Sequence, residues 1–143
     1  MTPSRAFLDT NVLVYLFDHE VPAKTERARN LLEQAEPGEL VLSAQVLGEF
    51  YVVVTRKLER PLDSSQATQA VDWLALFPVI PIGAALVKTA IQTSRASQVS
   101  YWDSLILATA AAGGCERLLT EDLKHGQVFK SVRVENPFRD QPF

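Results

Sequence analysis

The chain has 143 residues, of which 47% are hydrophobic and 22% are charged, and its formal net charge is -3. This length suits one domain with its own hydrophobic core, so we expect residues 1–143 to form a single domain. The lone Cys115 excludes an internal disulfide and a zinc site built from thiolates. No apolar run reaches the roughly 18 residues of a membrane span, and no signal peptide is visible, so we expect a cytoplasmic protein with no membrane partner.

Short apolar runs alternate along the chain with longer segments of helical periodicity. We expect strands at residues 6–8, 40–42, 117–120 and 131–134, and helices at residues 11–17, 23–34, 44–59, 65–76, 84–95 and 101–112. Pro81 restricts residues 79–82 to an edge strand or a loop. Ser43 and Ser100 stand where the N-caps of two helices are expected. The alternation predicts an α/β fold in which helices cover both faces of a parallel sheet.

Four acidic residues lie near the expected ends of strands or in the helices that follow them. Asp9 directly follows the first strand, and Asp122 follows a later strand with Glu121 just before it. Glu49 lies about two turns into the helix after the second strand, and Asp103 lies in the first turn of the last helix. Since ligands of parallel α/β sheets bind outside the carboxyl ends of the strands, we expect a site there.

Acids from separate segments are the ligands that an oxygen-only Mg²⁺ or Mn²⁺ site needs. Without a cation, several neighbouring carboxylates would raise one another's pKa, whereas a bound divalent ion removes this cost. No histidine cluster, cysteine pair or glycine-rich loop competes as a site in this sequence. The joint placement of the acids therefore indicates a magnesium site in which manganese can substitute.

Each of these acids also has a purely structural interpretation. Asp9 could cap the helix that follows it, and Asp122 could cap the short segment after it. Asp103 stands three residues after Ser100, which is the spacing of a capping box. Glu49 interrupts an apolar run, so it lies either on an exposed stripe or in a buried site. The acids are therefore more informative together than singly.

The sequence pI of about 5.4 argues against simple electrostatic binding to nucleic acid. If four of the 17 acids are reserved for a metal site, however, 14 basic residues face 13 acidic ones in the rest of the chain. A bound cation would also reverse the local charge. Arg56 and Arg60 are expected on the helical face of Glu49, where a guanidinium could bind a phosphate. The alternative is a solvated basic face that pairs with residues such as Glu59.

Apolar residues at helical spacing occupy the middle of the chain. They are Trp73, Leu74, Leu76, Phe77, Leu86, Val87 and Ile91. We expect them to belong mainly to the core, and the alternative for some of them is the face of a dimer.

Four segments, in order, carry a resemblance to a known family. They are residues 7–13 with Asp9, residues 42–50 with Glu49, residues 101–110 with Asp103, and residues 119–123 with Asp122, followed by 125–127 and 134–138. In this order and spacing they resemble the PIN-domain ribonucleases, and particularly the VapC-type toxins of bacterial toxin–antitoxin pairs. The resemblance covers nearly the whole chain.

The resemblance implies a PIN-like fold, with a parallel sheet of four or five strands flanked by helices. It implies a Mg²⁺-dependent endoribonuclease of a type II toxin–antitoxin system, whose catalytic and metal-binding quartet is Asp9, Glu49, Asp103 and Asp122. Thr10 or Asn11 would form hydrogen bonds at the edge of the site. The implied partners are an RNA substrate, a second copy in a homodimer, and a cognate antitoxin whose C-terminal segment blocks the site.

The fourth segment departs from many relatives, because it reads Thr-Glu-Asp where they carry a neutral or basic middle residue. Glu121 could therefore share or replace the role of Asp122 as a metal ligand. The expected reaction is hydrolysis of a phosphodiester by water, which leaves 5′-phosphate and 3′-hydroxyl ends. Arg56 or Arg60 would contact flanking RNA phosphates.

Two other functions compete with the ribonuclease. A phosphatase of the haloacid-dehalogenase type also begins with a strand followed by an Asp, but residues 9–12 lack its second acid. The other competitor is a module that keeps the PIN fold and binds a partner without catalysis. The presence of all four acids argues against this second alternative.

Overall fold

The computed structural model describes residues 4–139, so residues 1–3 and 140–143 of the expected domain lie outside the described residues. Its strands are β1 (Ala6–Leu8), β2 (Leu40–Ser43), β3 (Val79–Ile80), β4 (Arg117–Leu119), β5 (Val128–Phe129) and β6 (Val132–Glu135). Its helices are α1 (Thr10–Val14), α2 (Pro22–Gln34), α3 (Ala44–Arg56), α4 (Ser64–Leu74), α5 (Ala84–Ala96) and α6 (Tyr101–Ala112).

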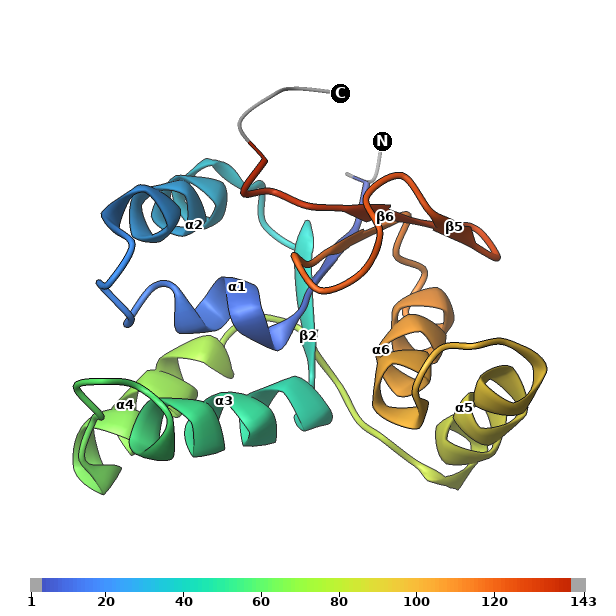
Figure 1. The fold of residues 1–143 in the computed structure, drawn as a ribbon, viewed down its shortest axis with the longest axis horizontal. Coiled ribbons are helices and arrows are strands. Elements are labelled where there is room, and N and C mark those ends of the chain that lie inside the picture. Colours follow the sequence, from blue (N-terminus) through green and yellow to red (C-terminus); the bar gives the residue numbers. More distant parts are fainter. Residues whose placement is uncertain (1–3, 140–143) are drawn as a thin grey trace.

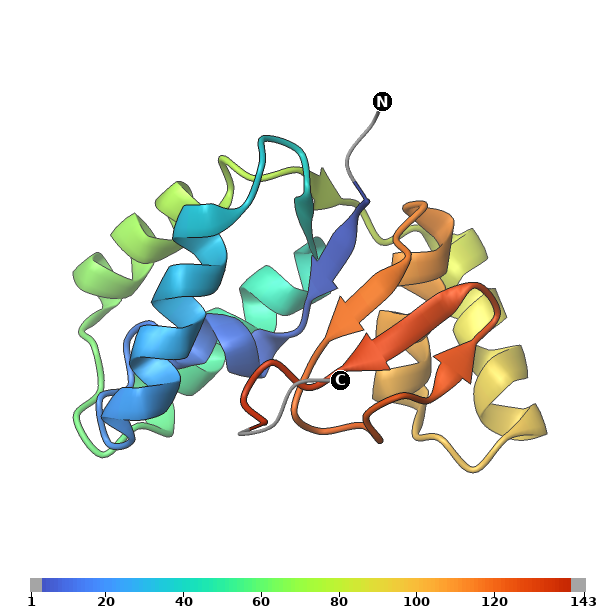
Figure 2. The same cartoon turned by 90° about the horizontal axis from the view of Figure 1, so that it is seen from above.

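The strands form one six-stranded sheet in the order β3-β2-β1-β4-β6-β5. All neighbours are parallel except β5, which pairs antiparallel with β6 at one edge. Helices α1 to α4 gather on one side of the sheet and α5 with α6 on the other (Figures 1 and 2). The expected α/β fold with a helix-covered parallel sheet is thus confirmed, whereas the expected number of four or five strands was too low.

Two serine caps define the starts of the helices that frame the site. The Ser43 hydroxyl accepts a hydrogen bond from the Val46 amide at 3.2 Å, and the Ser100 hydroxyl accepts one from the Asp103 amide at 3.1 Å. These bonds satisfy amides that have no partner within the helix. Helix α6 has the bounds expected from the sequence, and both expected caps are confirmed.

Helix α3 ends at Arg56 rather than at the expected residue 59. The Lys57 amide still donates to the Val53 carbonyl, but the chain then turns back, and the Leu62 amide donates to the Val54 carbonyl at 2.8 Å. Arg60 consequently lies in this turn and not on the helix. The expected shared helical face of Glu49 and Arg60 was therefore wrong.

Other boundaries also differ from the sequence-based expectation. Helix α1 ends at Val14 instead of residue 17, because the next amides, of Leu16 and Phe17, donate to carbonyls three residues back in a tighter turn. Strand β5 was not expected, since its two residues carry no alternating pattern. It is joined to β6 by a turn in which Lys130 has a positive φ of 53°.

The hydrophobic core lies between the central strands and the helices on both sides. Its largest fully buried side chains include Phe7, Leu8, Val41, Leu42, Phe50, Leu107 and Leu118. Cys115 is a buried core residue, and burial raises the pKa of its thiol to about 11. In the apolar middle segment, Leu74 is buried but Leu76 is 82% exposed, so the expectation of core holds for only part of that segment. Within residues 4–139, no helix has the length and apolar character needed to cross a bilayer.

Candidate active site

Asp9 stands at the carboxyl end of β1, near the middle of the sheet, and only 6% of its surface is exposed. One carboxylate oxygen, Oδ1, accepts from the Thr10 amide at 2.7 Å, so Asp9 is also the N-cap of α1. The other oxygen, Oδ2, accepts from the Thr120 hydroxyl at 2.8 Å. The capping role expected for Asp9 is therefore present, and it fixes the carboxylate at the edge of the sheet.

Burial raises the pKa of Asp9 from its ordinary value of 3.8 to about 6. The hydrogen bonds from Thr120 and Thr10 counteract part of this rise, while the negative charges of Asp122 and Glu49 add to it. The three carboxylates thus act on one another electrostatically. A site of this kind favours a proton or a cation, since either relieves the desolvated negative charge.

The Thr120 hydroxyl joins three parts of this site. Besides donating to Asp9, it accepts from the Asn11 side-chain amide at 3.0 Å and from the Asp122 backbone amide at 3.1 Å. Thr120 is fully buried. The sequence analysis included Thr120 in the Thr-Glu-Asp segment of the resemblance but assigned it no role in the site.

Glu49 reaches the site from α3 and is held by two side chains. Its oxygens accept from the Thr10 hydroxyl at 2.8 Å and from the Gln45 amide nitrogen at 2.7 Å. The side-chain carbonyl oxygen of Gln45 is buried and has no hydrogen-bond partner in the described part of the chain. An unsatisfied oxygen acceptor therefore lies beside Glu49, one turn earlier on the same helix. Gln45 too was missed from the sequence.

The neighbouring acids Glu121 and Asp122 have different partners. Asp122 accepts from the Asn11 side chain at 3.0 Å, which attaches it to the Asp9 network. Glu121 instead forms an ion pair with Lys24 at 2.8 Å and accepts from the Tyr15 hydroxyl. The geometry thus brings Asp122 to the acidic site and commits both Glu121 oxygens to other partners.

Asp103 lies in the first turn of α6, opposite the first turn of α3. The two turns are close, because the Gln45 amide nitrogen lies 3.5 Å from the Trp102 carbonyl oxygen. The Asp103 side chain forms no hydrogen bond or ion pair within residues 4–139, and the reciprocal bond of a capping box is not made. Asp103 therefore borders the site without joining the bonded network of the other three acids.

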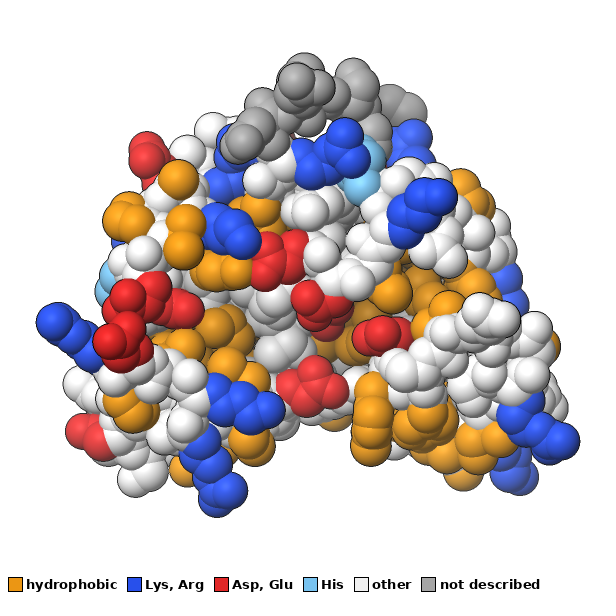
Figure 3. Space-filling view, viewed as in Figure 1, with side chains coloured by type: hydrophobic (Ala, Val, Ile, Leu, Met, Phe, Trp, Pro, Cys, Tyr) orange, Lys and Arg blue, Asp and Glu red, His pale blue; other side chains and the backbone are white. Residues whose placement is uncertain are grey.

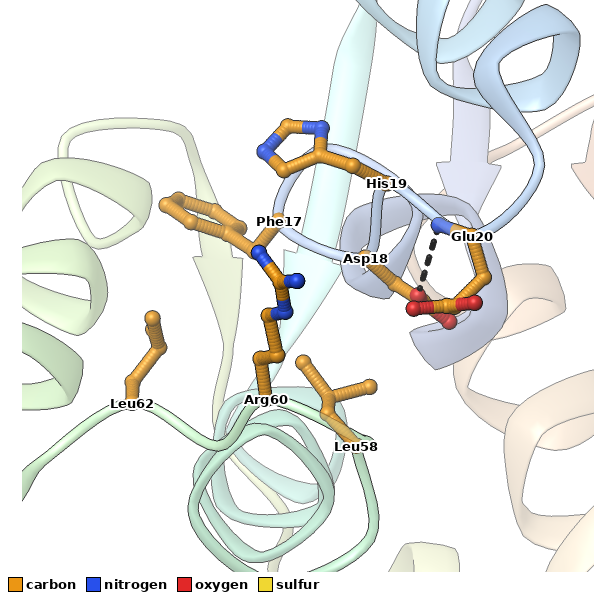
Figure 4. A pocket seen from close by; sticks show the side chains of 7 residues that line it. All are labelled: Phe17, Asp18, His19, Glu20, Leu58, Arg60 and Leu62. Carbon is orange, nitrogen blue, oxygen red and sulfur yellow. Dashed lines mark hydrogen bonds between the residues drawn. The ribbon is translucent and has the colours of Figure 1, made fainter.

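A pocket of about 380 Å³ is lined by Glu49 and Asp122 but not by Asp9 or Asp103. Its lining comprises Thr10, Asn11, Val14, Tyr15, Asp18, Glu49, Val53, Lys57, Leu58 and Asp122. Figure 3 shows acidic side chains gathered in the hollow at the middle of this face, with basic side chains on its border. Arg56 does not line this pocket, and Arg60 lines an adjacent one of about 440 Å³ (Figure 4).

The donor set fits a hard divalent cation. The buried Asp9 carboxylate and the unsatisfied Gln45 amide oxygen are oxygen ligands of the kind that Mg²⁺ and Mn²⁺ accept. Among the described residues, no three His, Cys, Asp or Glu side chains are grouped closely enough to enclose an ion. A Mg²⁺ site in a protein needs only one or two carboxylates, because the ion keeps several waters.

The fold and the acids at the carboxyl end of its sheet define an α/β protein with an acidic site at that edge. The PIN domain family model matches residues 6–131. The chain therefore belongs to the PIN domain family, as its sequence motifs predicted. This membership removes the haloacid-dehalogenase alternative. No curated protein matches the chain at a significant level.

Solved structures of toxins and toxin–antitoxin complexes share this fold. VapC20 of Mycobacterium tuberculosis, described as a toxin that cleaves the sarcin-ricin loop, is 20% identical, with 79% of this chain and 86% of VapC20 covered and a TM-score of 0.64. A toxin–antitoxin complex from Klebsiella pneumoniae is 23% identical, with coverage of 92% and 97% and a TM-score of 0.69. DNA-bound VapBC from Salmonella typhimurium is 16% identical, with coverage of 94% and 98% and a TM-score of 0.64.

Proposed function

We propose that the protein is a metal-dependent endoribonuclease and the toxin of a type II toxin–antitoxin pair. The observation that carries this proposal is the buried Asp9 carboxylate at the end of the central strand β1, with Glu49 and Asp122 near enough to raise its pKa. A desolvated carboxylate without a cationic partner is costly, so the buried Asp9 beside two further acids is better explained by a site than by stability alone.

Asp9 would be the principal ligand of Mg²⁺ or Mn²⁺, with Asp122, Glu49 and Asp103 completing the acidic quartet. A divalent cation held there would stabilise negative charge at the cleaved phosphate and lower the pKa of a bound water. Thr120 and Thr10 orient Asp9, while Thr10 and Gln45 orient Glu49. Hydrolysis by water would leave 5′-phosphate and 3′-hydroxyl ends and would not use the RNA 2′-hydroxyl as the nucleophile.

The partners belong to the same proposal. The similar structures include a toxin described as cleaving the sarcin-ricin loop and toxin–antitoxin complexes, one of them bound to DNA. We therefore expect an RNA substrate, a cognate antitoxin that blocks the acidic site, and a homodimer acting in the cytoplasm. Light scattering of the purified chain tests the homodimer directly.

The decisive experiment incubates the purified protein, free of antitoxin, with total RNA and a tRNA pool. Mg²⁺ or Mn²⁺ is either present or removed with a chelator, and the Asp9→Asn variant runs in parallel. We expect cleavage that needs the metal, yields 5′-phosphate ends and is absent in the variant. Equal cleavage by Asp9→Asn would contradict the assigned site.

The competing function is a PIN-fold module that binds without catalysis. It predicts that the unmodified protein binds Mn²⁺ tightly in calorimetry yet cuts none of the RNAs under any metal condition. Metal-dependent cleavage excludes this competitor, because a module that only binds produces no new RNA ends.

A further inference from the structure

Lys57, the residue that directly follows α3, lines the acidic pocket, whereas the sequence analysis had expected Arg56 on the side of Glu49. Glu49, Val53 and Lys57 follow one another at intervals of four residues, and all three line the pocket. Arg56 lines neither this pocket nor the adjacent one. Lys57 and not Arg56 therefore shares the pocket with the acids.

Lys57 has no carboxylate partner of its own. Its side chain is exposed and forms no ion pair within residues 4–139, although Asp18, Glu49 and Asp122 line the same pocket. Eight residues of helix separate it from Glu49, which is about 12 Å along the helix axis. Because Lys57 is not paired with an acid in the described part of the chain, its ammonium group is available to an anion from outside.

A second cation lies further along the same path. The adjacent pocket is lined by Phe17, Asp18, His19, Glu20, Leu58, Arg60 and Leu62, and it shares Asp18 and Leu58 with the acidic pocket. Arg60 is exposed and, like Lys57, forms no ion pair in the described part of the chain. The two pockets thus adjoin each other, with one available cation in each.

Figure 4 shows how charge is divided across this second pocket. Arg60 extends toward Phe17 and His19, whereas the side chains of Asp18 and Glu20 lie together on the other side. Asp18 is held there by a hydrogen bond from the Glu20 amide at 3.2 Å. A polyanion entering the pocket would therefore be repelled from the loop of Asp18 and Glu20 and attracted to the side of Arg60.

We infer that Lys57 and Arg60 bind successive phosphates of the substrate strand on one side of the bond that is cleaved. This inference rests on the proposed function. It predicts that the substrate strand leaves the acidic site past the C-terminal end of α3. A guanidinium fork and an ammonium group both bind phosphate, the former in a bidentate manner. Neither cation contacts the cleaved bond, so both are binding residues and not catalytic ones.

The test measures binding of a fluorescein-labelled RNA oligonucleotide of mixed sequence by anisotropy at several KCl concentrations. All proteins carry Asp9→Asn to prevent cleavage. Each lost phosphate contact lowers the slope of log Kd against log salt by about 0.7 for a single strand. We expect a decrease of about 1.4 for Lys57→Gln combined with Arg60→Gln, and no decrease for the matched Arg56→Gln variant.

Lys57→Arg, with Arg60 unchanged, keeps the positive charge. Its salt-dependence slope should equal that of the protein that carries Asp9→Asn alone. An unchanged slope in the double variant would overturn the inference, and so would an equal decrease in Arg56→Gln. Unchanged melting temperatures are expected for all these exposed positions and exclude misfolding as the cause of a loss.

Cleavage by the protein with native Asp9 is measured separately with Mn²⁺. If it cuts RNA while the double variant keeps the parent slope, the phosphate path is wrong and the proposed function stands. If it does not cut RNA while the slope decreases as expected, the ribonuclease function is wrong and the path stands as an RNA-binding site.

Discussion

Thr120 and Asp9 lie 111 residues apart in the sequence, and the Thr120 hydroxyl donates to Asp9 Oδ2 at 2.8 Å. The contact exists because β1 and β4 are parallel neighbours whose carboxyl ends coincide, with Leu8 paired to Leu119. The orientation of the central carboxylate is thus set by the strand beside it. Two more hydrogen bonds, from Asn11 and Asp122, make the same hydroxyl the common point of the site.

Thr120→Val should lower the free energy of unfolding by about 1–3 kcal/mol, because it leaves the buried Asp9 Oδ2 without its hydrogen-bond donor. It should also lower cleavage, since Asp9 loses the group that orients one of its oxygens. Thr120→Ser, which keeps the hydroxyl, is the matched control. Urea unfolding and RNA cleavage are measured for both, and equal behaviour of the two variants would exclude the orienting role.

Without metal, stability should depend on the protonation of Asp9. Its folded pKa of about 6 lies above the ordinary 3.8, so the folded state binds the proton more tightly than the unfolded state. The free energy of unfolding should therefore fall as the pH rises from about 4 to about 6. The loss is on the order of 2 to 3 kcal/mol.

Asp9→Asn cannot ionise, so it should be more stable than the unmodified chain at pH 7 without metal, and the two should converge near pH 4. Added Mn²⁺ should stabilise the unmodified chain above pH 6 and leave the variant nearly unchanged. Denaturation in chelator and in Mn²⁺ across this pH range checks both statements. A variant less stable than the unmodified chain at pH 7 would contradict the pKa argument.

Glu121→Gln and Asp122→Asn should differ in metal binding. Asp122 contacts the Asp9 network through Asn11, whereas Glu121 is engaged by Lys24 and Tyr15. We expect Asp122→Asn to weaken Mn²⁺ binding by about tenfold or more, and Glu121→Gln to change it little. Isothermal titration calorimetry measures both affinities. The reverse order would make Glu121 the fourth ligand.

Ser43→Ala should lower the free energy of unfolding by about 1 kcal/mol, because the Val46 amide loses its partner at the start of α3. Ser64→Ala is the control, since the exposed Ser64 begins α4 but Asp63 caps that helix. Thermal unfolding of the two variants compares these positions. Similar losses at both would mean that the Ser43 cap contributes no more than an ordinary surface serine.

Local signals predicted most of the fold. Ser43 and Ser100 mark helix starts through side-chain chemistry that acts within three residues, so their role was visible in the sequence. The end of α3 was not, because Leu62 folds back onto Val54 through a backbone bond that no local pattern encodes. The two residues of β5 pair only because β6 is already in the sheet.

In the candidate site too, features set by the local sequence were predictable, and features set by the assembled fold were not. Asp9 was predictable because it follows a strand directly, and the position of a carboxylate after a buried strand is a local feature. Thr120 and Gln45 were missed because their roles come from partners brought together by the fold. Lys57 was missed because the sequence does not show which of two neighbouring cations, Arg56 or Lys57, is turned toward the pocket. That becomes known only when the packing of the helix is known.

The position of β1 between β2 and β4 has a consequence for synthesis of the chain. Asp9 is among the first residues made, but the strand on one flank of β1, and the Thr120 that follows it, come from residues 117–120. While the earlier part of the chain emerges from the ribosome, β1 has one open flank and its carboxylate has no threonine to orient it. The acidic site is therefore completed late in translation, and under the proposed function a nascent copy would lack a complete active site while it is still on the ribosome.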